Sequence, residues 1–338
     1  MNKVIDVHVH FGAPGRNGQP VHGCYWSDRF EQSIAFWAFR FITGTLFGKM
    51  NYLRAKRKVY KLVRKSSKVD QIVLLALDQV YDEQGRSDLA NWTNLYVDNR
   101  TVAKLAEENH RILFGASVHP YRGDWESELD FCLGHKAVLC KWLPSAQCID
   151  PSDPKCDPFY DKLAEHQLPL LCHVGLEKSI PTHDDSFNQF NNAKYLRRAL
   201  EKGVPVIFAH SSLPFEPTDL HNDPGFLDFL DVMEEAKATN WQWNAYADIS
   251  ALCLLRGSYI PDLLAKIPAD RFVFGSDYPI PMISLGPREM PNLWVRLQHL
   301  VDAIFTRNLL DKNYKNLEDF GFPPGVFTAA DDLFRQII

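Results

Sequence analysis

The chain lacks the features that mark secreted and membrane-spanning proteins. Its seven cysteines are an odd number, and no two of them form a C-x-x-C pair. A disulfide framework is therefore not expected, whereas reduced thiols in a cytoplasmic setting are. There is no run of about 18 uncharged apolar residues, so no membrane span is predicted. The sequence enters its first apolar run almost at once, and no signal peptide is expected either.

Positive charge and a nucleotide-binding turn are also missing. The net charge of -5 gives no general attraction to nucleic acid. No glycine-rich dinucleotide turn follows the first apolar run, which weakens an open doubly wound sheet as the fold. We find no internal repeat and no low-complexity segment. With 46% hydrophobic and 23% charged residues, the 338-residue chain has the composition of a globular protein with a large core.

Short apolar runs alternate with helical patterns along most of the chain. Gln71–Leu77 is continuously apolar, as expected for a strand buried on both faces. The alternation predicts an α/β fold, a (β/α)8 TIM barrel in a single domain over residues 1–338, with a helical insertion after strand 1 and a C-terminal helical tail on the outside. The predicted strands are 4–12, 71–77, 112–118, 137–143, 168–174, 204–209, 243–249 and 271–275. The predicted helices include 91–109, 159–166, 192–202, 225–238 and 259–267.

Residues 12–69 do not fit the alternation and are expected to form the insertion. A loop rich in glycine and proline is followed by an aromatic helical segment, 30–47, and a basic one, 49–68, which contains no acid. We interpret the basic segment as a helix packed over the barrel mouth or against a second subunit of a homo-oligomer, in preference to a membrane-surface helix. The aromatic side chains either roof the pocket, favouring an apolar or aromatic ligand, or are buried against a second subunit: Phe36, Trp37, Phe39, Phe41 and Phe47.

Side chains able to bind a metal or move a proton stand at five of the predicted strand ends. His8 and His10 are two residues apart, so they point to the same face of a strand. Alone, this pair is as compatible with hydrogen-bonded strand-end residues as with metal ligands. In such barrels the catalytic residues lie at the carboxyl ends of the strands. Chance would place polar residues of this kind at fewer than five strand ends, so the set indicates a functional site. The other candidates are Lys141, His173, His210 and Asp277.

Three further residues are assigned smaller roles. His119, after strand three, is expected to bind substrate, with an ordinary loop histidine as the alternative. Asp248, at the end of strand seven, is expected to orient a metal-binding imidazole. Cys172 lies on the alternate face from His173 and is expected to fill the core rather than act as a nucleophile.

Five motifs at the strand ends together resemble the amidohydrolase superfamily. The similarity is to the amidohydrolase-related branch, which also holds non-oxidative decarboxylases similar to aminocarboxymuconate semialdehyde decarboxylase, and it covers nearly the whole chain except the insertion. The tail stretch Gly321–Phe327 is similar to the C-terminal helical tail of this branch. The motifs are Asp6–Gly12, Lys141–Gln147, Pro169–Gly175, Ala209–Ser211 and Phe274–Pro279.

The resemblance implies a divalent metal, Zn²⁺ or alternatively Mn²⁺, held by His8, His10, His173 and Asp277. Neutral imidazoles and a carboxylate bind Zn²⁺ well and leave a position open for water, whose proton Asp277 can accept. Two versions remain open. In the two-metal version, carbamylated Lys141 bridges two ions and His210 binds the second. In the one-metal version, His210 is a general acid or base and Lys141 pairs with a carboxylate of the substrate or of a neighbouring residue.

Two reactions on a small-molecule substrate are compatible with this set. Metal-dependent hydrolysis of an ester, lactone, amide or related bond is the first hypothesis, because the ligand set including Lys141 is complete. Metal-dependent non-oxidative decarboxylation of an aromatic or unsaturated carboxylic acid is the alternative, supported by the branch and by His210. A barrel that has lost its metal and only binds a partner is disfavoured by the complete ligand set.

Overall fold

The computed structural model describes residues 2–42, 50–177, 179–214, 220–252, 259–280, 307–335 and 337. Phe47 of the aromatic segment and residues 293–306 of the predicted tail lie outside this range. Within it, no helix combines the length and the apolar character needed to cross a membrane.

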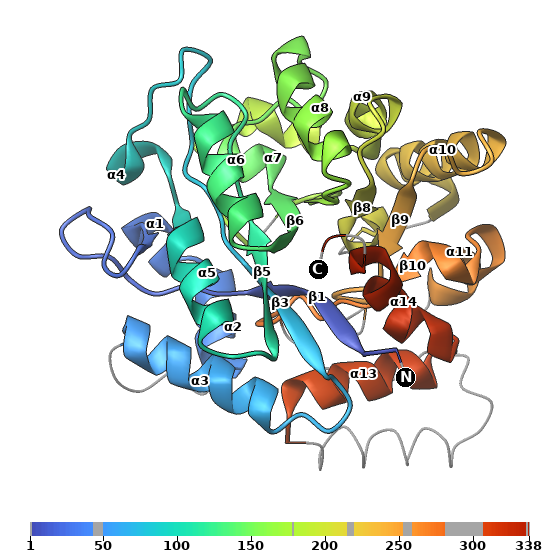
Figure 1. The fold of residues 1–338 in the computed structure, drawn as a ribbon, viewed down its shortest axis with the longest axis horizontal. Coiled ribbons are helices and arrows are strands. Elements are labelled where there is room, and N and C mark those ends of the chain that lie inside the picture. Colours follow the sequence, from blue (N-terminus) through green and yellow to red (C-terminus); the bar gives the residue numbers. More distant parts are fainter. Residues whose placement is uncertain are drawn as a thin grey trace.

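Eight parallel strands form one sheet in which neighbours follow the order of the chain (Figure 1). Backbone hydrogen bonds connect the first strand to the segment after the last one: Val7 N donates to Phe274 O (2.9 Å) and Asp277 N donates to His8 O (2.8 Å). These bonds close the sheet, and the predicted parallel barrel is confirmed. The strands are β1 (Ile5–His10), β3 (Gln71–Leu75), β5 (Ile112–Ala116), β6 (Ala137–Trp142), β7 (Leu170–Cys172), β8 (Val206–Phe208), β9 (Ala245–Asp248) and β10 (Phe272–Val273).

Helices surround the sheet (Figure 1). Apolar residues of these helices are buried, as in α5 and α10. In α5, Asp98 caps the first turn by accepting from Arg100 N, and Val102 and Leu105 are buried against β5. The helices are α1 (Asp28–Glu31), α2 (Ile34–Ile42), α3 (Tyr52–Arg64), α4 (Leu89–Trp92), α5 (Asn99–Glu107), α6 (Trp125–Gly134), α7 (Pro144–Gln147), α8 (Asp157–Glu165), α9 (Arg197–Glu201), α10 (Pro224–Ala238), α11 (Ile260–Lys266), α13 (Leu309–Asp319) and α14 (Pro324–Phe334).

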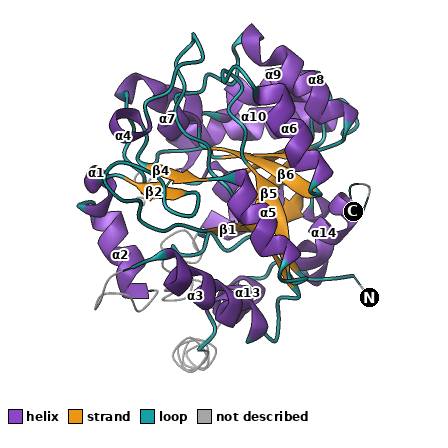
Figure 2. Ribbon diagram, turned by 60° about the vertical axis from the view of Figure 1, so that its left-hand side comes forward, coloured by secondary structure: helices purple, strands orange, loops and turns teal. Residues whose placement is uncertain are grey.

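A small antiparallel ribbon, which the sequence did not predict, interrupts the expected helix 91–109. The stretch is divided into α4, the strand β4 (Leu95–Val97) and α5. β4 pairs with β2 (Cys24–Trp26) from the insertion, and Tyr25 lies opposite Tyr96. The prediction of a continuous helix was wrong because this long-range pairing overrides the local helical pattern. The ribbon, α1 and α2 lie on the side of the molecule away from α14 (Figure 2).

The basic segment forms α3, the helix between the first two strands of the barrel. Ala55, Val59 and Val63 lie four residues apart and are buried in the main core. Lys56 pairs with Glu108 at the end of α5, and Arg57, Lys61 and Arg64 are exposed. The helix packs on the outside of the barrel and not over its mouth as predicted, because its apolar face is buried in the main core. Packing against a second subunit stays a prediction, and the residues between β1 and α3 form the insertion proper.

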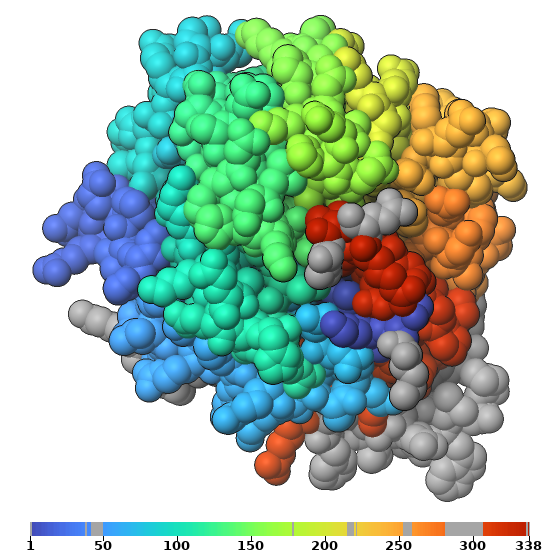
Figure 3. All heavy atoms as spheres, in the orientation of Figure 1, coloured from blue at the N-terminus to red at the C-terminus, as the bar shows by residue number. Residues whose placement is uncertain are grey.

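The C-terminal helix α14 covers the end of the barrel where the strands begin. Its side chains Ala330 and Phe334 belong to the buried cluster that fills the barrel interior, together with Ile5, Val7, Val73, Leu139, Leu171, Ile207 and Val273. Figures 1 and 3 show this helix next to the N-terminal residues. The side chain of Asn2 accepts from Arg335 (2.6 Å) and donates to Asp332 (3.1 Å). The predicted tail is helical, and its last helix contributes to the barrel core.

Six cysteines in the described part of the chain are free and buried. Burial raises the pKa of the thiols of Cys24, Cys140, Cys148 and Cys172 to about 12, which leaves little thiolate at neutral pH. At pH 8 we expect these six thiols to react with Ellman's reagent at least about 100-fold more slowly in the native protein than in guanidinium chloride. Because Cys253 lies outside the described residues, fast labelling of more than one thiol per native chain would contradict the prediction.

Candidate metal centre

Strand alternation brings Lys141 and His173 to the carboxyl end of the barrel. Leu139 of β6 and Leu171 of β7 belong to the interior cluster. Two residues later, on the same face, β6 carries Lys141 and the chain after β7 carries His173. Lys141 and Leu171 are paired in the register of the two strands. Along these strands, the side chains that face the barrel interior are therefore apolar in the middle and polar at the carboxyl end.

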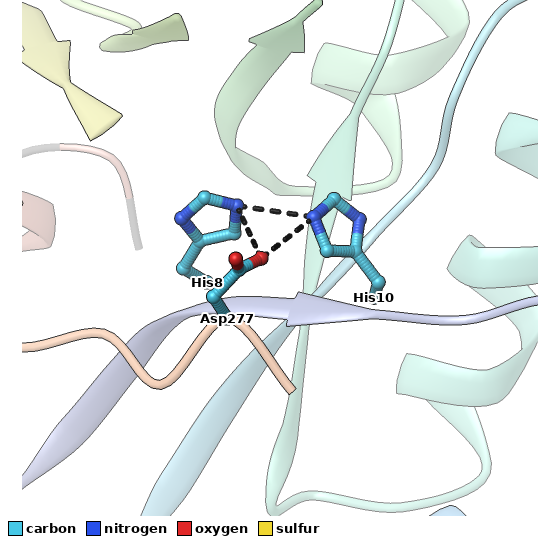
Figure 4. A group of neighbouring side chains, drawn as sticks. All are labelled: His8, His10 and Asp277. Carbon is cyan, nitrogen blue, oxygen red and sulfur yellow. Dashed lines mark hydrogen bonds and ion pairs between the residues drawn. The ribbon is translucent and has the colours of Figure 1, made fainter. Parts of the chain in front are cut away.

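Three predicted ligands meet at this end, as Figure 4 shows. The Nε2 atoms of His8 and His10 are 3.1 Å apart, and Asp277 Oδ1 lies 3.4 Å from the first and 3.2 Å from the second. Burial lowers the pKa of His8 well below its usual range, which favours the neutral form of the ring that metals bind. Two imidazoles and a carboxylate converging on one point suit a divalent ion.

Asp248 holds the His8 ring from behind. His8 Nδ1 lies 2.7 Å from Asp248 Oδ2. Burial raises the pKa of Asp248 to about 7. In its ionised form the carboxylate only accepts, which puts the proton on Nδ1 and turns the Nε2 lone pair toward the cluster. The hydroxyl of Ser250 donates to the same carboxylate and therefore accepts from His210 Nδ1 at 2.8 Å. The Asp248 carboxylate and the Ser250 hydroxyl thus fix the tautomers of His8 and His210. Orienting a metal-binding imidazole is the role that was expected for Asp248.

Replacing Asp248 with asparagine tests this support. The variant loses the acceptor that holds the His8 proton on Nδ1, and we expect metal affinity to fall by about 10- to 100-fold. Competition with a chelating dye measures the affinity. Asp311→Asn is a matched control, because Asp311 is also buried and also accepts from serine but anchors α13 to residues 66–68. Equal affinity in wild type and Asp248→Asn would show that the Asp248 carboxylate does not support metal binding through His8.

His210 lies at the other side of the cluster. Its ring stacks on His8 at a centroid separation of 5.2 Å, and its Nε2 is 3.7 Å from Asp277 Oδ2. His210 and Asp277 both have a φ of 58°, in the left-handed region that is uncommon for residues other than glycine. Such backbone conformations gather at functional sites, where the surrounding structure holds them. Here they turn both side chains back toward the barrel axis.

Lys141 is fully buried, and its Nζ has no hydrogen-bond partner in the described part of the chain. Burial lowers the pKa of this amine. A buried polar atom without a partner is costly, and native proteins retain one where another group completes it. The neutral amine is also the form that reacts with CO₂. The surroundings of Lys141 therefore fit an amine that is completed by a group other than the polypeptide. A carbamate that bridges metal ions would be such a group.

Glu177 was missed in the sequence. Its Oε2 lies 3.5 Å from His173 Nε2, and its Oε1 accepts from Ile180 N at 3.0 Å. Burial raises the pKa of this carboxyl group. The only sequence signal is an acid four residues after the histidine, and the loop that folds it back cannot be read from periodicity.

His119 is not brought to the cluster. It is fully buried, its Nε2 lies 2.8 Å from Gln147 O, and its Nδ1 accepts from Tyr121 N at 3.2 Å. Burial lowers the pKa of the ring to about 3. Both nitrogens are used within the protein, so the expected substrate contact is not found in this arrangement.

A cavity of about 480 Å³ opens over the cluster. On one side it is lined by His10, His173, His210, Glu177 and Asp277. On the opposite side lie aromatic and aliphatic residues of the insertion, among them Trp26, Phe30 and Phe39. Of the predicted aromatic residues, Phe39 lines the cavity and Phe36 packs against it. Trp37 and Phe41 are exposed, and their burial against a second subunit stays a prediction.

Comparisons with known proteins agree with this geometry. A family model described as "Amidohydrolase" (Amidohydro_2) matches residues 5–313. No curated protein matches the chain.

Solved structures share the fold at low identity. An uncharacterized TIM-barrel protein from Bordetella bronchiseptica is 16% identical with a TM-score of 0.53, over 94% of this chain and 99% of that one. A putative 2-pyrone-4,6-dicarboxylic acid hydrolase from Pseudomonas putida is 12% identical with a TM-score of 0.52, over 95% and 98%. The 5-carboxyvanillate decarboxylase of Sphingomonas paucimobilis is 12% identical with a TM-score of 0.54, over 99% of each chain.

Proposed function

Because the chain belongs to the amidohydrolase family, we propose that it is a hydrolase that uses a divalent metal to cleave an ester, lactone, amide or related bond of a small molecule. The family assignment confirms the resemblance carried by the strand-end motifs. Its members are enzymes and include both hydrolases and decarboxylases. The observation that carries the hydrolase proposal is the convergence of His8, His10 and Asp277, together with the buried Lys141, whose Nζ has no hydrogen-bond partner among the described residues.

The donor set favours Zn²⁺, with Mn²⁺ as the alternative. His8, His10, His173 and Asp277 would hold one ion, and Lys141 with His210 would complete a site for a second. A bound ion would supply water of lowered pKa and would polarise the bond under attack. Asp277 Oδ1 faces the two histidines, while its Oδ2 faces His210. The carboxylate is thus placed to accept a proton from the attacking water and to pass it toward the leaving group.

Decarboxylation of an aromatic or unsaturated acid is the second candidate. His210 lines the cavity, and Ser250 holds its Nδ1 proton so that Nε2 faces the substrate space. When protonated, that nitrogen could deliver a proton to the carbon from which CO₂ departs. The hydrolase is preferred because the ligand set of the two-metal version, Lys141 included, is complete; in the decarboxylase, Lys141 would instead pair with a carboxylate of the substrate.

An assay panel on metal-loaded protein separates the two reactions. Lactones, esters and amides are followed by acid release, and hydroxybenzoates by CO₂ release. Hydrolysis of at least one bond class that is lost on chelation and restored by Zn²⁺ or Mn²⁺ is the expected result. CO₂ release without hydrolysis would overturn the hydrolase proposal in favour of the decarboxylase.

The cellular setting and the assembly are part of the same proposal. Six free, buried thiols in the described part of the chain support a reducing, cytoplasmic compartment. A homo-oligomer stays a prediction, which light scattering on the purified protein would test.

A further inference from the structure

The cavity over the metal centre is chemically divided into two halves. Among the described residues that line it, the formally charged side chains are Glu177 and Asp277, both on the side of the metal cluster. No lysine or arginine is part of this described lining. Among the described lining residues, an anionic group of a ligand therefore finds favourable partners at the metal centre, and a second one would lie against apolar side chains.

The roof is an interlocked aromatic cluster. Trp26 packs edge-on against Phe30 and Phe36, with ring centroids 6.4 Å and 5.1 Å away, and Phe36 also contacts Phe39. Phe36 is 1% exposed and supports the rings that face the cavity. Aromatic surfaces held in this way bind flat or extended apolar groups through their area.

The apolar lining continues out through the mouth. Ile34 and Leu176 line the cavity, yet they are 89% and 60% exposed. Trp37 and Phe41 follow Ile34 at helical spacing on α2 and are 53% and 66% exposed. Exposed apolar side chains at a cavity mouth gain free energy when a ligand covers them.

We infer that the substrate carries one polar, metal-binding group joined to an aromatic or alkyl body that reaches from the metal centre to the mouth, and has no second anionic group. This inference rests on the proposed metal-dependent function and specifies its substrate class. The inferred substrate class therefore differs from the dicarboxylic acid that is named as the substrate of the putative hydrolase of Pseudomonas putida.

Calorimetric titration of Zn²⁺-loaded protein with alkyl hydroxamates tests the inference without turnover. The series runs from acetohydroxamate to octanohydroxamate, with 4-butylbenzohydroxamate and 4-carboxybenzohydroxamate as an apolar and an anionic pair. We expect the Kd to fall by about fourfold for each methylene buried in the cavity. The carboxylated probe should bind at least about tenfold more weakly than the butyl probe.

Two exposed residues supply variants that leave the core intact. Ile34→Ser and Leu176→Ser should weaken octanohydroxamate and leave acetohydroxamate unchanged. Leu227→Ser is the matched control, because Leu227 is an exposed leucine on α10 that does not line the cavity. If the longer probes bind no tighter than acetohydroxamate, or the carboxylated probe binds best, the substrate class is wrong while the metal site stands. If acetohydroxamate itself does not bind, the metal site fails and the inference fails with it.

Discussion

Exchanging Asp277 for asparagine is expected to lower kcat by about 10³- to 10⁴-fold and to reduce the metal retained after dialysis. The amide removes the negative charge between His8 and His10, and it cannot accept the proton that the reaction releases. The fold should persist, because the contact that fixes this turn is made by the backbone: Asp277 N donates to His8 O. Metal analysis by mass spectrometry and steady-state kinetics measure the two effects.

Asp270→Asn provides a matched control for this variant. Asp270 lies just before β10, the strand that Asp277 follows, and its side chain is 75% exposed. The control should keep both metal and turnover. Turnover within about tenfold of wild type in Asp277→Asn would show that this carboxylate is not the proton acceptor.

Replacing Lys141 with methionine should have opposite effects on activity and on stability. In the two-metal version, the variant loses the bridging group, and we expect about one metal ion fewer per chain and a fall in kcat of about 10³-fold or more. Methionine matches the length of the lysine stem without burying an amine. The metal-free variant should therefore be about 1–3 kcal/mol more stable than metal-free wild type, with a Tm higher by a few degrees.

A lysine with partners supplies the comparison for this variant. Lys162 is also shielded from solvent, but it pairs with Asp130 and Glu126, so Lys162→Met should not raise the Tm. Wild-type protein that is fully active with one ion per chain would exclude the two-metal version. Lys141 would then act on the substrate, and the methionine variant would mainly raise the KM.

Much of the barrel was readable from the sequence because strands buried on both faces leave continuous apolar runs. The same period of two places Lys141 above Leu139 and His173 above Leu171, so these candidates could be predicted. Asp277 and His210 could be predicted only as strand-end residues. The left-handed turns that aim them at the cluster depend on contacts across the barrel.

The parts that could not be predicted depend on distant pairings. β2 meets β4 across more than 60 residues, and the helical pattern of 91–109 carries no sign of that partner. Glu177 reaches His173 through a loop whose backbone donors fold it back. His119 could be placed after a strand, but the sequence did not show that both its nitrogens have partners within the core. The local sequence pattern predicts the face of the strand or helix on which a side chain lies. Long-range contacts determine which residues that side chain contacts.

The helix that closes the amino end of the barrel also contacts the residues that precede β1. Asn2 bonds to Asp332 and Arg335, and this junction lies on the face opposite the ribbon and the roof of the cavity (Figures 1 and 2). An affinity tag, a fluorescent fusion or a surface linker attached at either end would therefore point away from the substrate entrance. The same closeness makes the barrel suitable for circular permutation, in which a short linker joins the present ends and new ones are opened in an exposed loop.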